Sequence, residues 1–137
     1  MKKLKQYLNE TLNNDENINA FCILKPGFLQ YENEWFDMIE QNNWYIENKK
    51  EVTMTRQQAK TLYEPHKDKD FYNDLVDYMC SSKVIIITAY KDCDDPIKEM
   101  DKLKKHFRKL YGKNEMKNGM HSSDSLTNVK RESKIFF

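Results

Sequence analysis

His121 is the residue whose type and setting best suit chemistry in this sequence. It lies in the segment GKNEMKNGMHSSDS, residues 112–125, which has no apolar periodicity and therefore predicts a long loop. An imidazole among small polar residues in such a loop is accessible as a nucleophile or a base. The alternative is an ordinary loop histidine, and spacing alone leaves both open. His66, beside a proline, and His106, inside a Lys-rich stretch, are more typical of solvated surface residues.

Two basic features could meet a phosphate group. Lys25 follows the apolar run AFCIL, where a strand-end lysine either contacts a ligand or is simply exposed. The run KLKKHFRKLYGK, residues 102–113, is either a solvated helix face or a source of one or two phosphate-binding cations. The sequence has no GxxxxGK[ST], GxGxxG or GxSxG motif and no metal-ligand spacing, so any nucleotide is bound without a P-loop or a Rossmann crevice.

The elements that must position these residues can be predicted from apolar spacing and turn signals. Strands are expected over residues 19–24, 44–55, 84–90 and 132–137, the last being ESKIFF, and helices over 28–41, 56–64, 71–82 and 95–110. Thr55 and Asp95 are candidate N-caps, and Pro65 should end the second helix. The order β-α-β-α-α-β-α-β predicts an α+β, ferredoxin-like sandwich, a four-stranded antiparallel sheet covered by helices.

Composition restricts the class of protein. A chain of 137 residues suits one domain, with residues 1–17 as an amphipathic helical extension and 18–137 as the domain. The formal net charge of +1 argues against a general nucleic-acid binder. No apolar stretch approaches the roughly 20 residues of a membrane span, and the three cysteines, without a CxxC pair, suit a reducing compartment. We therefore expect a cytoplasmic protein that does not enter membranes.

Three segments resemble, in the same order, motifs of the nucleoside diphosphate kinase family. The strand end ILKP resembles that family's IKPD, and KDKDFYNDLVDYMCSSKVIIITAY resembles its KDRPFFxxLVxYMxSGPVVAM. NGMHSSDSLTNVKRESKIFF resembles its NxxHGSDSxxxAxREIxLWF. The matches cover about residues 19–137, and the last is the most specific, because a histidine with these neighbours and a downstream glutamate is rarely reached by chance.

The resemblance implies a role for each of eight residues. His121 would be the phosphorylated histidine, Glu132 the glutamate that orients it, and Ser123 a serine that supports the site. Tyr63 would be the tyrosine beside the histidine, Lys25 the lysine that reaches sugar and phosphate, and Arg108 a phosphate-binding arginine. Asn118 would be the asparagine that contacts the sugar, and Phe71 the aromatic residue that stacks on the base. The implied reaction moves the γ-phosphate of a nucleoside triphosphate to a nucleoside diphosphate by a ping-pong mechanism through phospho-His121. The resemblance also implies Mg²⁺ carried by the nucleotide phosphates, with no metal ligands from the protein, and homo-oligomers.

The sequence departs from the family pattern at several positions. The aspartate after KP is Gly27, the glycine after the histidine is Ser122, and residues 91–107 form a shortened stretch without the family's second phosphate-binding arginine. Lys98, Lys102 or Lys104 could supply the missing charge, and helix could replace the loop that clamps the nucleotide. These departures leave a second hypothesis, an inactive nucleotide-binding or protein-interaction domain of the same fold. A third, nucleic-acid binding through residues 102–113, is weaker.

Overall fold

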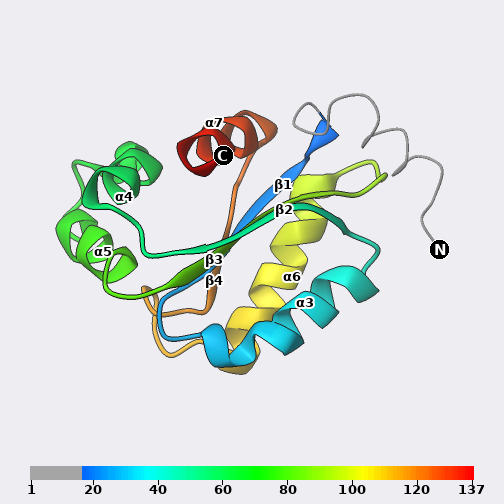
Figure 1. Ribbon diagram of the computed structural model, residues 1–137, viewed down its shortest axis with the longest axis horizontal. Helices are drawn as coiled ribbons and strands as arrows, with labels where there is room; N and C mark the ends of the chain where they lie inside the picture. The colour runs from blue at the N-terminus through cyan, green and yellow to red at the C-terminus, as the bar shows by residue number, and fades with distance from the viewer. Residues whose placement is uncertain (1–16) are drawn as a thin grey trace.

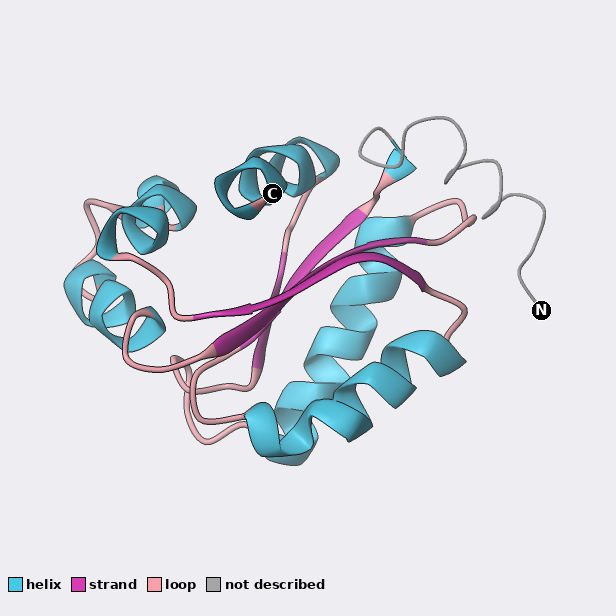
Figure 2. Ribbon diagram, in the orientation of Figure 1, coloured by secondary structure: helices cyan, strands magenta, loops and turns pink. Residues whose placement is uncertain are grey.

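The computed structural model describes residues 17–137, which form a four-stranded sheet with helices on both faces (Figures 1 and 2). The elements in chain order are β1 (Ala20–Leu24), the 3-10 helix η1 (Leu29–Tyr31), α3 (Glu32–Gln41), β2 (Tyr45–Val52), α4 (Arg56–Leu62), the 3-10 helix η2 (Glu64–His66), α5 (Tyr72–Met79), β3 (Val84–Tyr90), α6 (Pro96–Tyr111), β4 (Met120–Ser122) and α7 (Leu126–Phe136). The predicted amphipathic helix over residues 1–17 falls almost entirely outside the described residues.

The sheet has the strand order β2-β3-β1-β4, and all neighbouring strands are antiparallel. Every residue of β1 is buried, as is β3 except for its last residue, which fits their central positions and continuous apolar sequences. The edge strand β2 carries the polar sequence YIENKKEV and is largely half-buried or exposed. This arrangement confirms the predicted ferredoxin-like α+β fold.

The two faces of β1 belong to two separate halves of the core. Phe21 and Ile23 point into a cluster formed with α4, α5 and α7. Cys22 and Leu24 point the other way, into a cluster formed with α3 and α6. The alternation follows from the two-residue period of a strand. In Figure 1, α3 and α6 accordingly lie together on one side of the sheet, and α4, α5 and α7 cover the opposite side.

The prediction of a C-terminal strand was wrong. All of ESKIFF except its last residue lies in α7, and the start of this helix is capped by Ser125, whose side chain accepts a hydrogen bond from the Asn128 backbone N–H. Val129, Glu132, Ser133 and Phe136 are its buried residues, and their spacing of three and four is helical rather than alternating. The fourth strand is instead β4, so the segment 112–125 is not one continuous loop, and His121 sits on a strand within it.

Helix boundaries followed the predicted caps closely. Thr55 and Gln58 form a capping box at the start of α4, and Asp95 caps α6 by accepting a hydrogen bond from the Lys98 N–H. The second helix ends before Pro65, which lies in η2. The helix α6 runs without interruption through most of residues 91–107 and on to Tyr111. No helix among residues 17–137 has the length and apolarity to cross a bilayer.

Candidate active site

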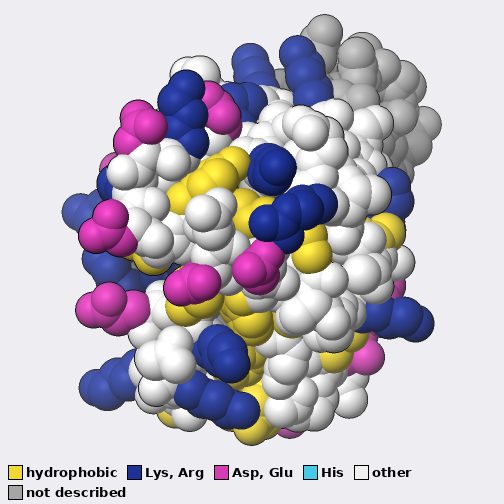
Figure 3. All heavy atoms as spheres, turned by 90° about the vertical axis from the view of Figure 1, so that its left-hand side faces the viewer, with side chains coloured by type: hydrophobic (Ala, Val, Ile, Leu, Met, Phe, Trp, Pro, Cys, Tyr) yellow, Lys and Arg dark blue, Asp and Glu magenta, His cyan; other side chains and the backbone are white. Residues whose placement is uncertain are grey.

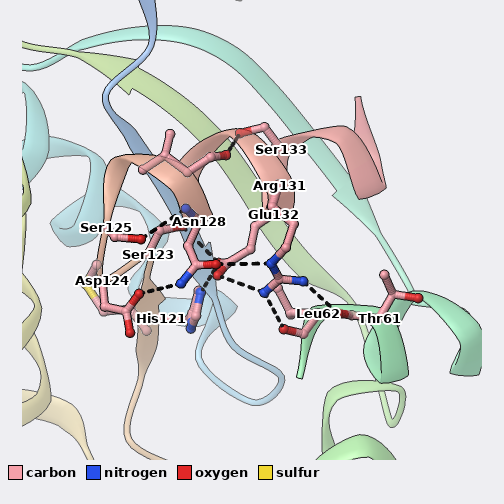
Figure 4. Close-up of polar contacts among 12 residues, drawn as sticks. Thr61, Leu62, His121, Ser123, Asp124, Ser125, Asn128, Arg131, Glu132 and Ser133 are labelled. Atoms are coloured by element: carbon pink, nitrogen blue, oxygen red, sulfur yellow. Dashed lines mark hydrogen bonds and ion pairs between the residues drawn. The ribbon is translucent and has the colours of Figure 1, made fainter. Parts of the chain in front are cut away.

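The imidazole of His121 is hydrogen-bonded to a buried carboxylate. His121 lies at the middle of β4, opposite Ile23 of β1, and its Nε2 lies 2.6 Å from Oε1 of Glu132 on α7. Figure 4 shows the two side chains approaching each other from these elements. Because the Glu132 side chain is only 5% exposed and the His121 side chain 17%, water competes little for this hydrogen bond. The fold thus brings these two residues, eleven positions apart in the sequence, into direct contact.

Glu132 is itself fixed by two further donors (Figure 4). The Ser123 hydroxyl donates to the same Oε1 at 2.9 Å, and Arg131 Nη2 lies 3.4 Å from Oε2. Arg131 also donates to the backbone carbonyls of Thr61 and Leu62, at 2.9 and 3.1 Å, which ties α7 to the end of α4. The carboxylate therefore has little freedom to turn away from the imidazole.

These contacts decide which ring nitrogen of His121 can react. A carboxylate only accepts hydrogen bonds, so Nε2 carries the proton and Nδ1 carries the free lone pair. Within residues 17–137 no protein group bonds Nδ1. Burial lowers the pKa of His121, and Glu132 opposes this effect only in part. The ring is therefore neutral at pH 7, the state in which an imidazole is nucleophilic.

A cavity of about 720 Å³ opens over His121. Its lining includes all but one of the eight residues predicted for the site: Lys25, Tyr63, Phe71, Arg108, Asn118, His121 and Glu132. Ser123 is the exception, since it lies behind Glu132 and is 4% exposed. Positions up to 107 residues apart in the chain thus converge on one concave site.

One wall of the cavity is cationic. Lys25 is only 4% exposed, and its Nζ donates to the Met116 carbonyl at 3.2 Å. The simple alternative of an exposed strand-end lysine was therefore wrong. Arg108 donates through Nε and Nη2 to the Met120 carbonyl, at 3.1 and 2.9 Å, and Lys104 lies on the same wall. Burial, followed by the charges of Arg108 and Lys104, lowers the pKa of Lys25 to about 7.

Aromatic and amide groups line the rest of the cavity. Phe71 is 44% exposed, which leaves much of its ring accessible. Tyr63 is buried and meets the His121 ring edge-on, with ring centroids 6.0 Å apart. Among the described residues, neither Tyr63 Oη nor Asn118 Oδ1 has a hydrogen-bond partner although both atoms are buried. Such atoms are costly to leave unpaired, so they favour a polar ligand in the cavity.

Sequence reasoning missed two residues of the site. Arg131 directly precedes Glu132, and this position beside a predicted site residue was the signal that could have identified it. Its hydrogen bonds to the end of α4 cannot be predicted from the sequence. His66 was interpreted as a solvated residue, yet it is half-buried, lines the cavity and lies 5.9 Å from the Phe71 ring. His106 is exposed, as predicted.

The comparison with protein families decides the identity of this arrangement. The family model described as nucleoside diphosphate kinase matches residues 19–137. The chain belongs to the nucleoside diphosphate kinase family. A nucleoside diphosphate kinase of Lawsonia intracellularis is 31% identical, covering 87% of this chain and 94% of that protein. One from Fervidobacterium nodosum is 36% identical over 86% of this chain and 87% of its own length.

Solved structures of the family share the fold. The nucleoside diphosphate kinase of Aquifex aeolicus superposes with a TM-score of 0.77 at 23% identity, covering 86% of this chain and 93% of that one. The enzyme of Encephalitozoon cuniculi gives a TM-score of 0.81 at 22% identity, covering 86% and 87%. The family fold is therefore kept in this member.

Proposed function

We propose that this member of the family is an active nucleoside diphosphate kinase, which transfers the γ-phosphate of a nucleoside triphosphate to a nucleoside diphosphate through phospho-His121. The observation that carries the proposal is the 2.6 Å bond between His121 Nε2 and Glu132 at the base of a cavity with a cationic wall. This geometry supplies a neutral nucleophile, a carboxylate that steadies its developing charge, and cations for the phosphates.

The first half-reaction starts from the Nδ1 lone pair of His121. A bond forms between Nδ1 and the γ-phosphorus, the bond from that phosphorus to the bridging oxygen breaks, and the nucleoside diphosphate leaves with the electron pair. The ring gains positive charge during attack, and Glu132 stabilises it through the Nε2–H. A second nucleoside diphosphate then takes the phosphoryl group by the reverse steps, which gives ping-pong kinetics.

Lys25 and Arg108 are proposed to bind the phosphates. Both lie on the cavity wall, and phosphoryl transfer depends mainly on alignment and on cations near the phosphate oxygens. Mg²⁺ would be carried by the nucleotide, since residues 17–137 contain no group of three metal-binding side chains and Mg²⁺ commonly takes phosphate and water ligands. The bound ion would neutralise charge on the phosphates.

The remaining predicted residues are proposed to hold the nucleoside. Phe71 presents an accessible ring that can stack on any base, because every base has a π face. The unpaired Asn118 Oδ1 can accept a hydrogen bond from a sugar hydroxyl. Tyr63, whose pKa is raised by burial, remains a neutral hydroxyl that can donate beside His121.

Two further properties are proposed on narrower support. The three cysteines are all unpaired, which suits the cytoplasm. Homo-oligomers are proposed from the family resemblance, and light scattering of the purified protein tests them.

On the face that Figure 3 shows, Lys and Arg side chains of the described residues are interspersed with Asp and Glu, so this face is not a continuous basic surface for nucleic acid.

The test is phosphorylation by γ-labelled ATP with Mg²⁺, followed by a chase with GDP. The wild type should take up acid-labile label and pass it to GDP, and His121→Ala should take up none. His106→Ala is the matched control, because His106 is exposed and lies outside the cavity lining. Wild-type protein that binds ATP without taking up label would refute the kinase and support the inactive nucleotide-binding domain.

A further inference from the structure

One face of α6 brings a second cation to the cavity beside Arg108. Lys104 and Arg108 are four residues apart, so they project from the same side of the helix, and both line the cavity. The Lys104 side chain is 15% exposed, whereas that of the adjacent Lys105 is 75% exposed. Lys98 and Lys102, the other two lysines of α6 that could have supplied the missing charge, are exposed and lie outside the cavity lining.

Lys104 is oriented by a carboxylate of its own helix. Its Nζ lies 3.1 Å from Asp101 Oδ1, and Lys105 Nζ lies 2.8 Å from the other oxygen of the same group. Asp101 is therefore shared by two lysines, which leaves Lys104 only partly neutralised. Consistent with this, the charge of Lys104 lowers the pKa of both Lys25 and His121.

Lys25, Lys104 and Arg108 thus form a cluster of three basic groups on the cavity, and the carboxylate that contacts Lys104 is shared with Lys105. Such a cluster is unfavourable without an anion, and the most suitable ligand is a group with several negative oxygens. The sequence lacks the family's second phosphate-binding arginine in residues 91–107, and Lys104 is the basic residue of that stretch that lines the cavity.

We propose that Lys104 binds a non-bridging oxygen of the β- or γ-phosphate beside Arg108, and so supplies from a continuous helix the charge that the missing arginine would bring. This inference rests on the proposed function for the identity of the ligand. A lysine provides a compact point charge rather than the two-point fork of a guanidinium. The contribution of Lys104 should therefore depend on its charge and on how many phosphates the ligand carries.

The experiment measures binding by calorimetry for AMP, ADP and the non-transferable β,γ-imido analogue of ATP, each with Mg²⁺. Lys104→Ala should weaken binding of ADP and the analogue by about 10- to 100-fold and change AMP by less than about threefold, because the first two carry the phosphates that Lys104 contacts. Lys104→Arg should restore most of the affinity. Lys105→Ala is the matched control, since Lys105 shares Asp101 but is exposed, and it should change nothing.

The outcomes separate this inference from the proposed function. An equal loss for AMP and the analogue, or an equal loss in Lys104→Ala and Lys105→Ala, would overturn the role of Lys104. A phosphate-dependent loss in a protein that takes no label from ATP would support Lys104 and refute the kinase. A wild type that binds none of the three nucleotides would overturn both, and circular dichroism confirms that the variants are folded.

Discussion

Replacing Glu132 by glutamine should slow phosphorylation of His121 and leave a side chain of the same size beside the imidazole. Glutamine has the same shape and can still accept from the His121 Nε2–H and the Ser123 hydroxyl, so the change removes a charge 2.6 Å from the ring nitrogen. Two unit charges 4 Å apart interact by about 4 kcal/mol at an effective dielectric constant of 20. With roughly half a charge developed on the ring, the loss is about 2 kcal/mol, or about 30-fold in rate.

The same substitution should move the pH dependence in a defined direction. The neutral form of His121 reacts, so the rate falls on the acid side as the ring is protonated. Glu132 raises the pKa of His121 against the lowering effect of burial. Removing its charge lowers that pKa further, and the acid limb should shift to lower pH while the plateau rate falls.

The assay is rapid-quench single turnover with γ-labelled ATP between pH 5 and 8. Glu115→Gln is the matched control, because it removes a carboxylate from the same cavity. Glu115 accepts a hydrogen bond from Asn118 through its backbone carbonyl, which the substitution leaves in place. It should leave both the plateau and the acid limb nearly unchanged. An unchanged plateau in Glu132→Gln, or an acid limb that moves to higher pH, would refute the charge argument.

Two other predictions concern binding and stability. Burial lowers the pKa of Lys25 to about 7, so Lys25 is mostly neutral at pH 8, and a bound phosphate should restore its proton. Calorimetry of ADP binding at pH 8, in buffers of different ionisation enthalpy, should therefore show uptake of about one proton. This uptake should be absent in Lys25→Met. Gly119→Ala should lower the free energy of unfolding in urea by about 2–4 kcal/mol, since Gly119 has a φ of 106° and an added Cβ would lie 2.8 Å from the Phe107 ring. Gly27→Ala, with a φ of 88° and no neighbour within 4 Å, should cost only about 1 kcal/mol, and equal losses would contradict the steric part.

The central strands and most helices could be predicted because their signals are local. The apolar run of β3 and the caps Thr55 and Asp95 act within a few residues of themselves. The C-terminal element was misassigned because a short apolar run does not distinguish strand from helix. The Ser125 cap and the tertiary packing of Val129 and Phe136 on the sheet favour the helix.

The sequence by itself determined the family and the residue types of the site. The spacing of His121, its neighbours and Glu132 within one motif was sufficient, and the family model confirms the membership. Sequence could not say which ring nitrogen is free, because that depends on a hydrogen bond between a strand and a helix. It also could not choose among three lysines of the shortened stretch.

Only the tertiary structure decided the environment of each group. Lys25 is chemically an ordinary lysine in the sequence, and its lowered pKa arises because folding buries it beside Lys104 and Arg108. Lys104 and Lys105 are adjacent and identical in type, yet the rotation of about 100° between neighbours on a helix turns one to the cavity and the other to solvent. Burial and electrostatic coupling depend on distances in space, so they exist only once the chain has folded.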